Sequence, residues 1–165
     1  EIRFDCSMTD LLQDDEYERR FAGVAKIYGD SAFQHYAQSH VMVIGIGGVG
    51  SWAVEALART GIGELTLVDM DVVAASNINR QLPAMSSTLG CEKIDVMAER
   101  CRSINPRIKI NLVDDYLSPD NVKALLATAP DLILDCIDDV KAKIALILYC
   151  RFNKIPLIEI GRAHV

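Results

Sequence analysis

Residues 41–50, VMVIGIGGVG, decide the fold of this 165-residue chain. An apolar run typical of a buried strand leads straight into glycines with the spacing G-x-G-G-x-G. Residues 51–60 follow with the spacing of an amphipathic helix. A strand that turns through glycines into a helix is the opening unit of nucleotide-binding α/β folds.

The glycines of this turn have separate tasks. Gly45 permits the tight turn, Gly47 beside Gly48 lets backbone N–H groups approach a phosphate, and Gly50 permits close packing of helix on strand. The next predicted strand ends at Asp69, where a carboxylate can accept hydrogen bonds from ribose hydroxyls. Strand, helix and acid together predict nucleotide binding, whereas glycines alone would fit a merely structural turn.

Strand and helix patterns alternate along the rest of the chain. We expect strands over 41–44, 65–68, 108–113, 132–134 and 155–158, and helices over 10–21, 30–38, 51–60, 91–104 and 140–152, with a further helix starting at 118–120. This alternation predicts an α/β, Rossmann-like, doubly wound fold: a mostly parallel sheet with helices on both faces, preceded by two N-terminal helices.

The net charge of −6 is concentrated at the start of the chain. Residues 1–18 carry seven acids and one base, so we treat them as an acidic N-terminal extension. An acidic chain is a poor bulk binder of nucleic acid, although a local basic patch remains open. No apolar run is long enough to span a membrane, and the first residues do not resemble a signal peptide, so we expect no membrane partner and a cytoplasmic location. The five scattered cysteines include no C-x-x-C pair and are best explained as buried apolar side chains.

Polar residues after the second strand favour a triphosphate over a dinucleotide. Arg80 and Lys93 would supply fixed cations for the charge on a polyphosphate, whereas the glycine pattern alone favours a nicotinamide dehydrogenase. The candidates between Asp69 and Lys93 are Ser76, Asn77, Arg80 and Gln81. The alternative is that Arg80 and Lys93 are solvated surface charges.

Two carboxylates follow the fourth predicted strand. Asp138 and Asp139 lie where the carboxyl end of a parallel strand opens onto a site, and Mg²⁺ prefers one or two carboxylates together with phosphate oxygens. We take Asp138 as the metal ligand and both as nucleotide-binding candidates. Either residue could instead cap the following helix.

This combination resembles the ubiquitin-activating-enzyme-like adenylyltransferase superfamily over roughly residues 19–158. The closer similarity is to the tRNA threonylcarbamoyladenosine dehydratase branch, and it is carried by residues 19–29, 50–63 and 153–157. The resemblance implies an ATP-binding adenylation domain over 19–158 that lacks the C-terminal part of the family fold. It also implies that the glycines, Asp69, residues 76–81, Lys93 and Asp138 bind ATP with Mg²⁺.

By the same resemblance, ATP would activate the threonyl carboxylate of threonylcarbamoyladenosine in tRNA as an acyl-adenylate. The ureido group of the modification would then close a ring and expel AMP, with Arg80, Lys93 and Asp138 as the catalytic residues. A homodimer and a cysteine-desulfurase or sulfur-acceptor partner are also implied. The alternatives are an adenylyltransferase that activates the C-terminal glycine of a ubiquitin-like sulfur carrier, an NAD-dependent oxidoreductase and a non-catalytic nucleotide-binding module.

Two further expectations concern tRNA contact and the end of the chain. The bases that could form a phosphate-binding patch are Arg19, Arg20, Lys26, Arg100, Arg102, Arg107, Arg151 and Lys154. Residues 159–165, EIGRAHV, back-translate to a common sequencing-library adapter, so we expect them to be an artefact, the alternative being a genuine short tail.

Overall fold

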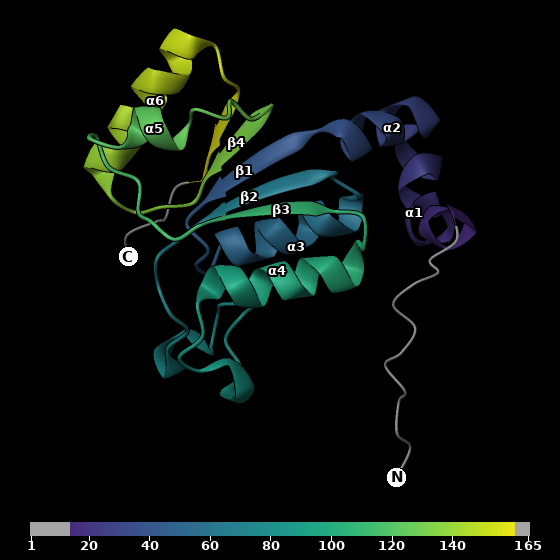
Figure 1. The fold of residues 1–165 in the computed structure, drawn as a ribbon, viewed down its shortest axis with the longest axis horizontal. Coiled ribbons are helices and arrows are strands. Elements are labelled where there is room, and N and C mark those ends of the chain that lie inside the picture. Colours follow the sequence, from purple (N-terminus) through teal and green to yellow (C-terminus); the bar gives the residue numbers. More distant parts are fainter. Residues whose placement is uncertain (1–13, 161–165) are drawn as a thin grey trace.

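The computed structural model describes residues 14–160, in which strands and helices alternate as the sequence predicts (Figure 1). The strands are β1 (His40–Ile44), β2 (Glu64–Val68), β3 (Lys109–Val113), β4 (Leu132–Asp135) and β5 (Leu157–Glu159). The α-helices are α1 (Asp14–Tyr28), α2 (Asp30–Gln38), α3 (Gly50–Thr60), α4 (Lys93–Ile104), α5 (Val122–Leu125) and α6 (Val140–Asn153). Two short 3₁₀ turns, η1 (Ala75–Asn77) and η2 (Ser86–Thr88), lie between β2 and α4.

The strands form one five-stranded sheet in the order β3-β2-β1-β4-β5, and every strand pair is parallel. The register aligns Ile44 at the end of β1 with Val68 on one side and Asp135 on the other. This is the strand order of a doubly wound fold, so the predicted fold class is confirmed. The strand order reverses at β1, because β2 and β3 extend the sheet on one side and β4 and β5 on the other. Ligands of such sheets bind at that point, beyond the carboxyl ends of the strands.

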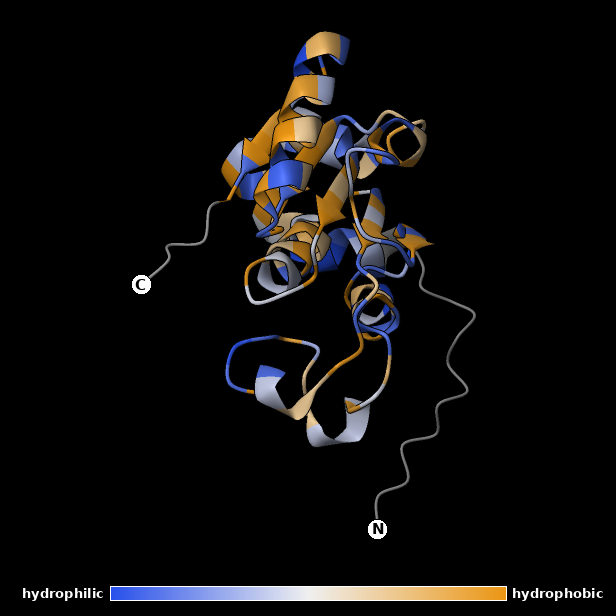
Figure 2. Cartoon of the chain, turned by 90° about the vertical axis from the view of Figure 1, so that its left-hand side faces the viewer, coloured by the Kyte–Doolittle hydropathy of each residue, from blue (hydrophilic) through white to orange (hydrophobic). Residues whose placement is uncertain are grey.

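Helices cover both faces of the sheet, with α3 and α4 on one face and α5 and α6 on the other (Figure 1). Alternate residues of β1 serve the two cores: Val41 and Val43 pack toward α3 and α4, whereas Met42 and Ile44 pack toward α6. Because both faces are buried, the central strands are mostly apolar, and they are largely orange in Figure 2.

The two N-terminal helices are present, and the first is longer at its C-terminal end than predicted. α1 continues to Tyr28, where Gly29, with a φ of 89°, separates it from α2. Tyr17, Phe21 and Phe33 form a small aromatic core between these helices. α1 therefore extends across the domain boundary expected after residue 18, while residues 10–13 of the predicted helix lie outside the described residues.

Two predicted element boundaries are wrong. The helix expected from Ser118 begins only at Val122, because Ser118 and Asn121 bond each other's backbone N–H groups in a turn that precedes the helix. β5 begins at Leu157, since the preceding residue is a proline without an N–H, and it includes Glu159. Within residues 14–160, no helix has the length and apolar character that crossing a membrane requires.

Candidate nucleotide-binding site

A cavity of about 1020 Å³ opens beyond the carboxyl ends of β1, β2 and β4. It brings together ten of the twelve predicted site residues: Gly45, Gly47, Gly48, Asp69, Asn77, Arg80, Gln81, Lys93, Asp138 and Asp139. The other two, Gly50 and Ser76, do not line it. The cavity therefore lies where the strand order places ligands, and it is built from segments far apart in sequence.

The glycine turn, residues 45–50, is shaped by close backbone contacts. Gly45 has a φ of 89°, a conformation that favours glycine, and a Cβ there would meet the Cys136 carbonyl oxygen at 3.0 Å. A Cβ on Gly50 would lie 1.8 Å from the Gly45 carbonyl oxygen, so Gly50 closes the turn without facing the cavity. A Cβ on Gly47 would meet nothing within 4 Å, which leaves backbone open toward a ligand.

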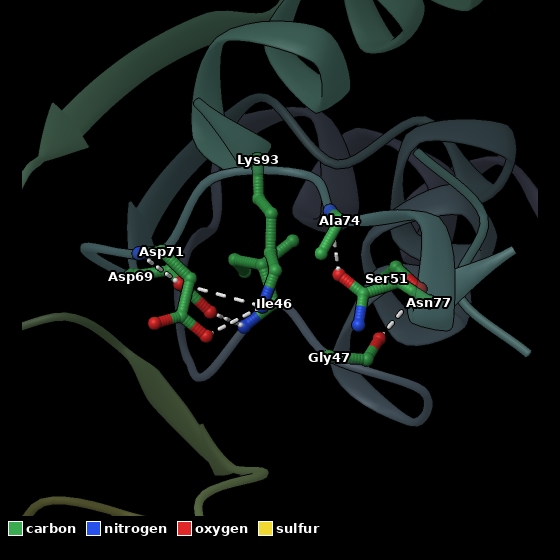
Figure 3. A network of polar contacts seen from close by, with 8 residues as sticks. All are labelled: Ile46, Gly47, Ser51, Asp69, Asp71, Ala74, Asn77 and Lys93. Carbon is green, nitrogen blue, oxygen red and sulfur yellow. Dashed lines mark hydrogen bonds and ion pairs between the residues drawn. The ribbon is translucent and has the colours of Figure 1, made fainter. Parts of the chain in front are cut away.

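Asp69 links the glycine turn to the end of β2 (Figure 3). Its Oδ2 accepts a hydrogen bond from the Ile46 N–H at 2.6 Å, and its Oδ1 accepts one from the Asp71 N–H at 2.8 Å. The carboxylate thus holds the turn in place. A further lone pair on each oxygen leaves room for the ribose contact predicted from the sequence.

Lys93 is buried, which contradicts its interpretation as a solvated surface charge. Its side chain is 4% exposed, and Nζ lies 2.6 Å from Oδ2 of Asp71 and 4.0 Å from Oδ1 of Asp69. The sequence analysis missed Asp71, although the spacing Asp-x-Asp after β2 could have revealed it. The two carboxylates hold a cation at the cavity wall, at the first residue of α4.

Arg80 lies on the opposite side of the glycine turn, in an exposed position on the cavity wall. Its Nη1 donates to the Ser76 carbonyl at 2.9 Å and to Oδ1 of Asn79 at 3.0 Å. A Cβ placed on Gly48 would lie 3.5 Å from Cγ of Arg80, so the side chain passes directly over the turn. We call residues 80–82 the arginine segment.

The neighbours of Arg80 differ in what they could offer a ligand. The Asn77 side chain accepts a hydrogen bond from the Ala74 N–H at 3.0 Å and so shapes its own turn (Figure 3). Gln81 is 7% exposed, and its Oε1 is buried with no hydrogen-bond partner within residues 14–160. Gln81 also lines the cavity beside Arg80.

The two carboxylates after β4 have separate positions. Asp139 is the N-cap of α6, where its Oδ1 accepts from the Ala142 N–H at 2.7 Å, as the capping alternative expected. Asp138 is exposed on the cavity wall. Within residues 14–160, no group of three or more His, Cys, Asp or Glu side chains could hold a metal ion.

Comparison with known proteins identifies this arrangement. The sequence profile of the ThiF family matches residues 17–164. The chain belongs to the ThiF family. It is 52% identical over 156 residues to the tRNA threonylcarbamoyladenosine dehydratase of Haemophilus influenzae, a match that covers 94% of this chain and 60% of that protein. The Escherichia coli dehydratase is also 52% identical, over 149 residues.

Solved structures support the same family. The crystal structure of the E. coli tRNA N6-threonylcarbamoyladenosine dehydratase in complex with ATP matches with a TM-score of 0.88 and 50% identity. That match covers 93% of this chain and 63% of that one. More distantly, the molybdopterin-synthase adenylyltransferase of Salmonella typhimurium is 38% identical over 73% of this chain and 48% of its own length. The present chain therefore spans about 60% of the length of the dehydratases that it resembles.

Within residues 14–160 of this ThiF-family chain, no cysteine provides an activated nucleophile at the site. Cys136 lines the cavity, but burial, together with the neighbouring Asp135 carboxylate, raises the pKa of its thiol to about 11. Burial likewise raises the pKa of Cys101 to about 12. Both stay protonated near neutral pH and are poor nucleophiles.

Three of the bases expected to contact tRNA already have protein partners. Arg100 donates to both oxygens of Glu55, at 2.6 and 3.0 Å. The Arg107 guanidinium lies 4.0 Å from the centre of the Tyr17 ring. Arg20 donates to the carbonyls of Ser103 and Ile104. These side chains of the ThiF-family fold therefore contribute to its packing.

Proposed function

We propose that the chain is the ATP-binding part of an enzyme that dehydrates threonylcarbamoyladenosine in tRNA. The substrate carboxylate attacks the α-phosphate of ATP, which forms an acyl-adenylate and releases pyrophosphate. The ureido nitrogen then attacks the activated carbonyl, and AMP leaves as the ring closes. The oxygen lost from the substrate is carried away in AMP, so the nucleoside loses one water.

The observation that carries this proposal is the cavity itself, in a chain 52% identical to two dehydratases. Arg80 and Lys93 are among the cations that line it together with the glycine turn. These two side chains suit a triphosphate, because fixed cations stabilise the negative charge that develops at phosphorus. The proposed reaction needs no covalent intermediate on a side chain, which agrees with the protonated thiol of Cys136.

The residues of the site take distinct roles in this account. The open backbone at Gly47 binds phosphate oxygens, and Asp69 accepts from a ribose hydroxyl while it holds the turn. Arg80 and Lys93 stabilise charge on the phosphates. Gln81 lines the cavity next to Arg80 and shapes its wall.

Mg²⁺ fits this donor set only together with the triphosphate. Asp138 offers one exposed carboxylate on the cavity wall, and Mg²⁺ is commonly held by one or two carboxylates with phosphate oxygens and water. The ion would neutralise part of the phosphate charge when bound. Asp138 is the residue that we assign to it.

The partners extend the proposal. We assign a cytoplasmic location, a homodimer and a sulfur-acceptor partner, as the family resemblance suggests. Exposed apolar side chains beside the arginine segment, at Trp52, Ile78, Met85 and Leu89, support contact with a second copy. We assign the tRNA contacts to the other bases of the patch that the sequence predicts.

Two experiments test the proposal. ATP with Mg²⁺ should raise the melting temperature while NADH should not, and the opposite pattern would support the oxidoreductase alternative. In a longer clone with native ends, Arg80→Ala and Asp138→Ala should each abolish AMP formation and leave the fold intact, since both side chains are exposed. Near-normal activity in either variant would contradict its assigned role.

The second candidate is activation of a ubiquitin-like sulfur carrier, supported by the 38% identity to a molybdopterin-synthase adenylyltransferase. ATP–pyrophosphate exchange that requires a glycine-tailed carrier protein, without any change in the tRNA nucleoside, would favour it.

A further inference from the structure

Ser51 is a buried polar residue that joins two walls of the nucleotide site. It follows the glycine turn directly, in the first turn of α3, and has no exposed surface. Its Oγ donates to the Gly47 carbonyl oxygen at 2.6 Å and accepts from the Leu82 N–H at 3.2 Å. One hydroxyl thus connects the glycine turn with the arginine segment, 31 residues further along the chain.

The hydrogen bond from Ser51 to the Gly47 carbonyl is common in helices, whereas the bond from the Leu82 N–H to Ser51 is not. Serine and threonine in helices often donate to the carbonyl four residues earlier. Thr60 does so with Ala56 at 2.8 Å, at the other end of α3. At Ser51 the same oxygen also accepts a bond from a distant segment, which requires the donor and acceptor capacity of a hydroxyl.

Neighbouring contacts fasten the same segment to α3. Trp52 donates from Nε1 to the Arg80 carbonyl oxygen at 3.2 Å. The side chain of Arg80 passes over Gly48. The arginine segment is therefore held to the glycine turn through its backbone on both sides of Gln81, and both Arg80 and Gln81 face the cavity.

We propose that the Ser51 hydroxyl is a positioning group of the nucleotide site, which fixes the distance between the glycine turn and the arginine segment. This inference rests on the proposed function, because it assumes that the site binds ATP. Loss of the hydroxyl frees the Leu82 N–H and lets the segment move away from the turn. Arg80 then no longer meets the phosphates that the glycine turn binds, so ATP affinity falls although no group that touches ATP has changed.

The test compares Ser51→Ala, which removes both bonds, with Thr60→Ala, which removes only the local helix bond. Trp52 is the single tryptophan of the 165 residues, and its indole bonds the arginine segment, so its fluorescence reports the position of that segment without any ligand. Ser51→Ala should shift the Trp52 emission to longer wavelength and weaken binding of Mg-ATP about tenfold by calorimetry. Thr60→Ala should change neither. Ser51→Cys, which keeps a weak donor and acceptor at this position, replaces Ser51→Ala if that variant does not fold.

The outcomes separate this inference from the function on which it rests. Unchanged emission, or shifted emission with unchanged ATP affinity, overturns the positioning role. If the unmodified chain does not bind ATP while Ser51→Ala still shifts the emission, the coupling is supported and the proposed function fails instead.

Discussion

Lys143 and Asp135 form an ion pair in the interior, with Nζ of the lysine 2.9 Å from Oδ2 of a carboxylate that has no exposed surface. The other oxygen of Asp135 accepts from the Ile137 N–H at 3.1 Å. The pair thereby fixes the turn that leads from β4 to Asp138. Neither Asp135 nor Lys143 lines the cavity, so the pair supports this wall from behind it.

Lys143→Met should destabilise the fold by about 3 kcal/mol, because it leaves the Asp135 carboxylate buried without its partner. Lys143→Arg keeps the charge and should cost about 1 kcal/mol or less. Urea denaturation measures both free energies of unfolding. A Lys143→Met variant as stable as Lys143→Arg would show that Asp135 does not need the ion pair.

Glu55 should make stability fall at acid pH. Its hydrogen bond from Arg100 lowers the pKa of the carboxyl below its ordinary value of 4.5, with a smaller contribution from Arg59. A lowered folded-state pKa gives stability that is present above 4.5 and is lost as the pH falls through the lower value. Glu55→Gln should therefore lose less of its free energy of unfolding than the unmodified chain between neutral pH and about pH 3. If the free energy of unfolding fell equally with pH in the two proteins, Glu55 would not be the source of the acid destabilisation.

Lys93→Met should damage nucleotide binding more than stability. The nearer carboxylate that it leaves behind, Asp71, is 67% exposed and stays hydrated. The other, Asp69, lies 4.0 Å from Nζ and keeps its two backbone hydrogen bonds, so the free energy of unfolding should change by about 1 kcal/mol or less. Loss of a charge-assisted contact to phosphate should weaken ATP binding about tenfold or more by calorimetry. Lys109→Met is the matched control, because Lys109 pairs with Glu64 away from the cavity. Equal ATP affinity in the two variants would show that Lys93 does not contribute to ATP binding.

Cysteine alkylation should distinguish Cys91 from Cys136. Cys91 is exposed and should react with iodoacetamide near neutral pH, whereas the raised pKa of Cys136, about 11, should keep it protonated and slow. Peptide mass spectrometry follows each site, and the urea-unfolded chain provides the control in which both react. If Cys136 reacted as fast as Cys91 in the folded chain, its thiol would not have a raised pKa.

The sequence predicts most of the fold because its main signals are local. The apolar run before Gly45 and the helix spacing after it need only the chain itself, and the structure confirms both elements. The predicted helix start at Ser118 is wrong because Ser118 and Asn121 bond each other's backbone N–H groups. Composition does not reveal such a turn. The parallel direction of the strands follows from the alternation of strands and helices, since parallel strands require crossovers.

The site is less predictable where it depends on distant contacts. The sequence indicates Lys93 but not that Asp71 pairs with it, and it indicates Asp139 but cannot separate capping from ligand binding. Ser51 carries no signal of its own, because its second bond joins residues 31 positions apart. Such contacts exist only after the loops are folded onto the sheet.

The most direct test uses a version of the protein with native ends, incubated with ATP, Mg²⁺ and tRNA that carries threonylcarbamoyladenosine. Mass spectrometry of the nucleosides should show the loss of one water, with one AMP formed for each nucleoside converted. An unchanged nucleoside, under conditions in which the protein binds ATP, would contradict the proposed dehydration.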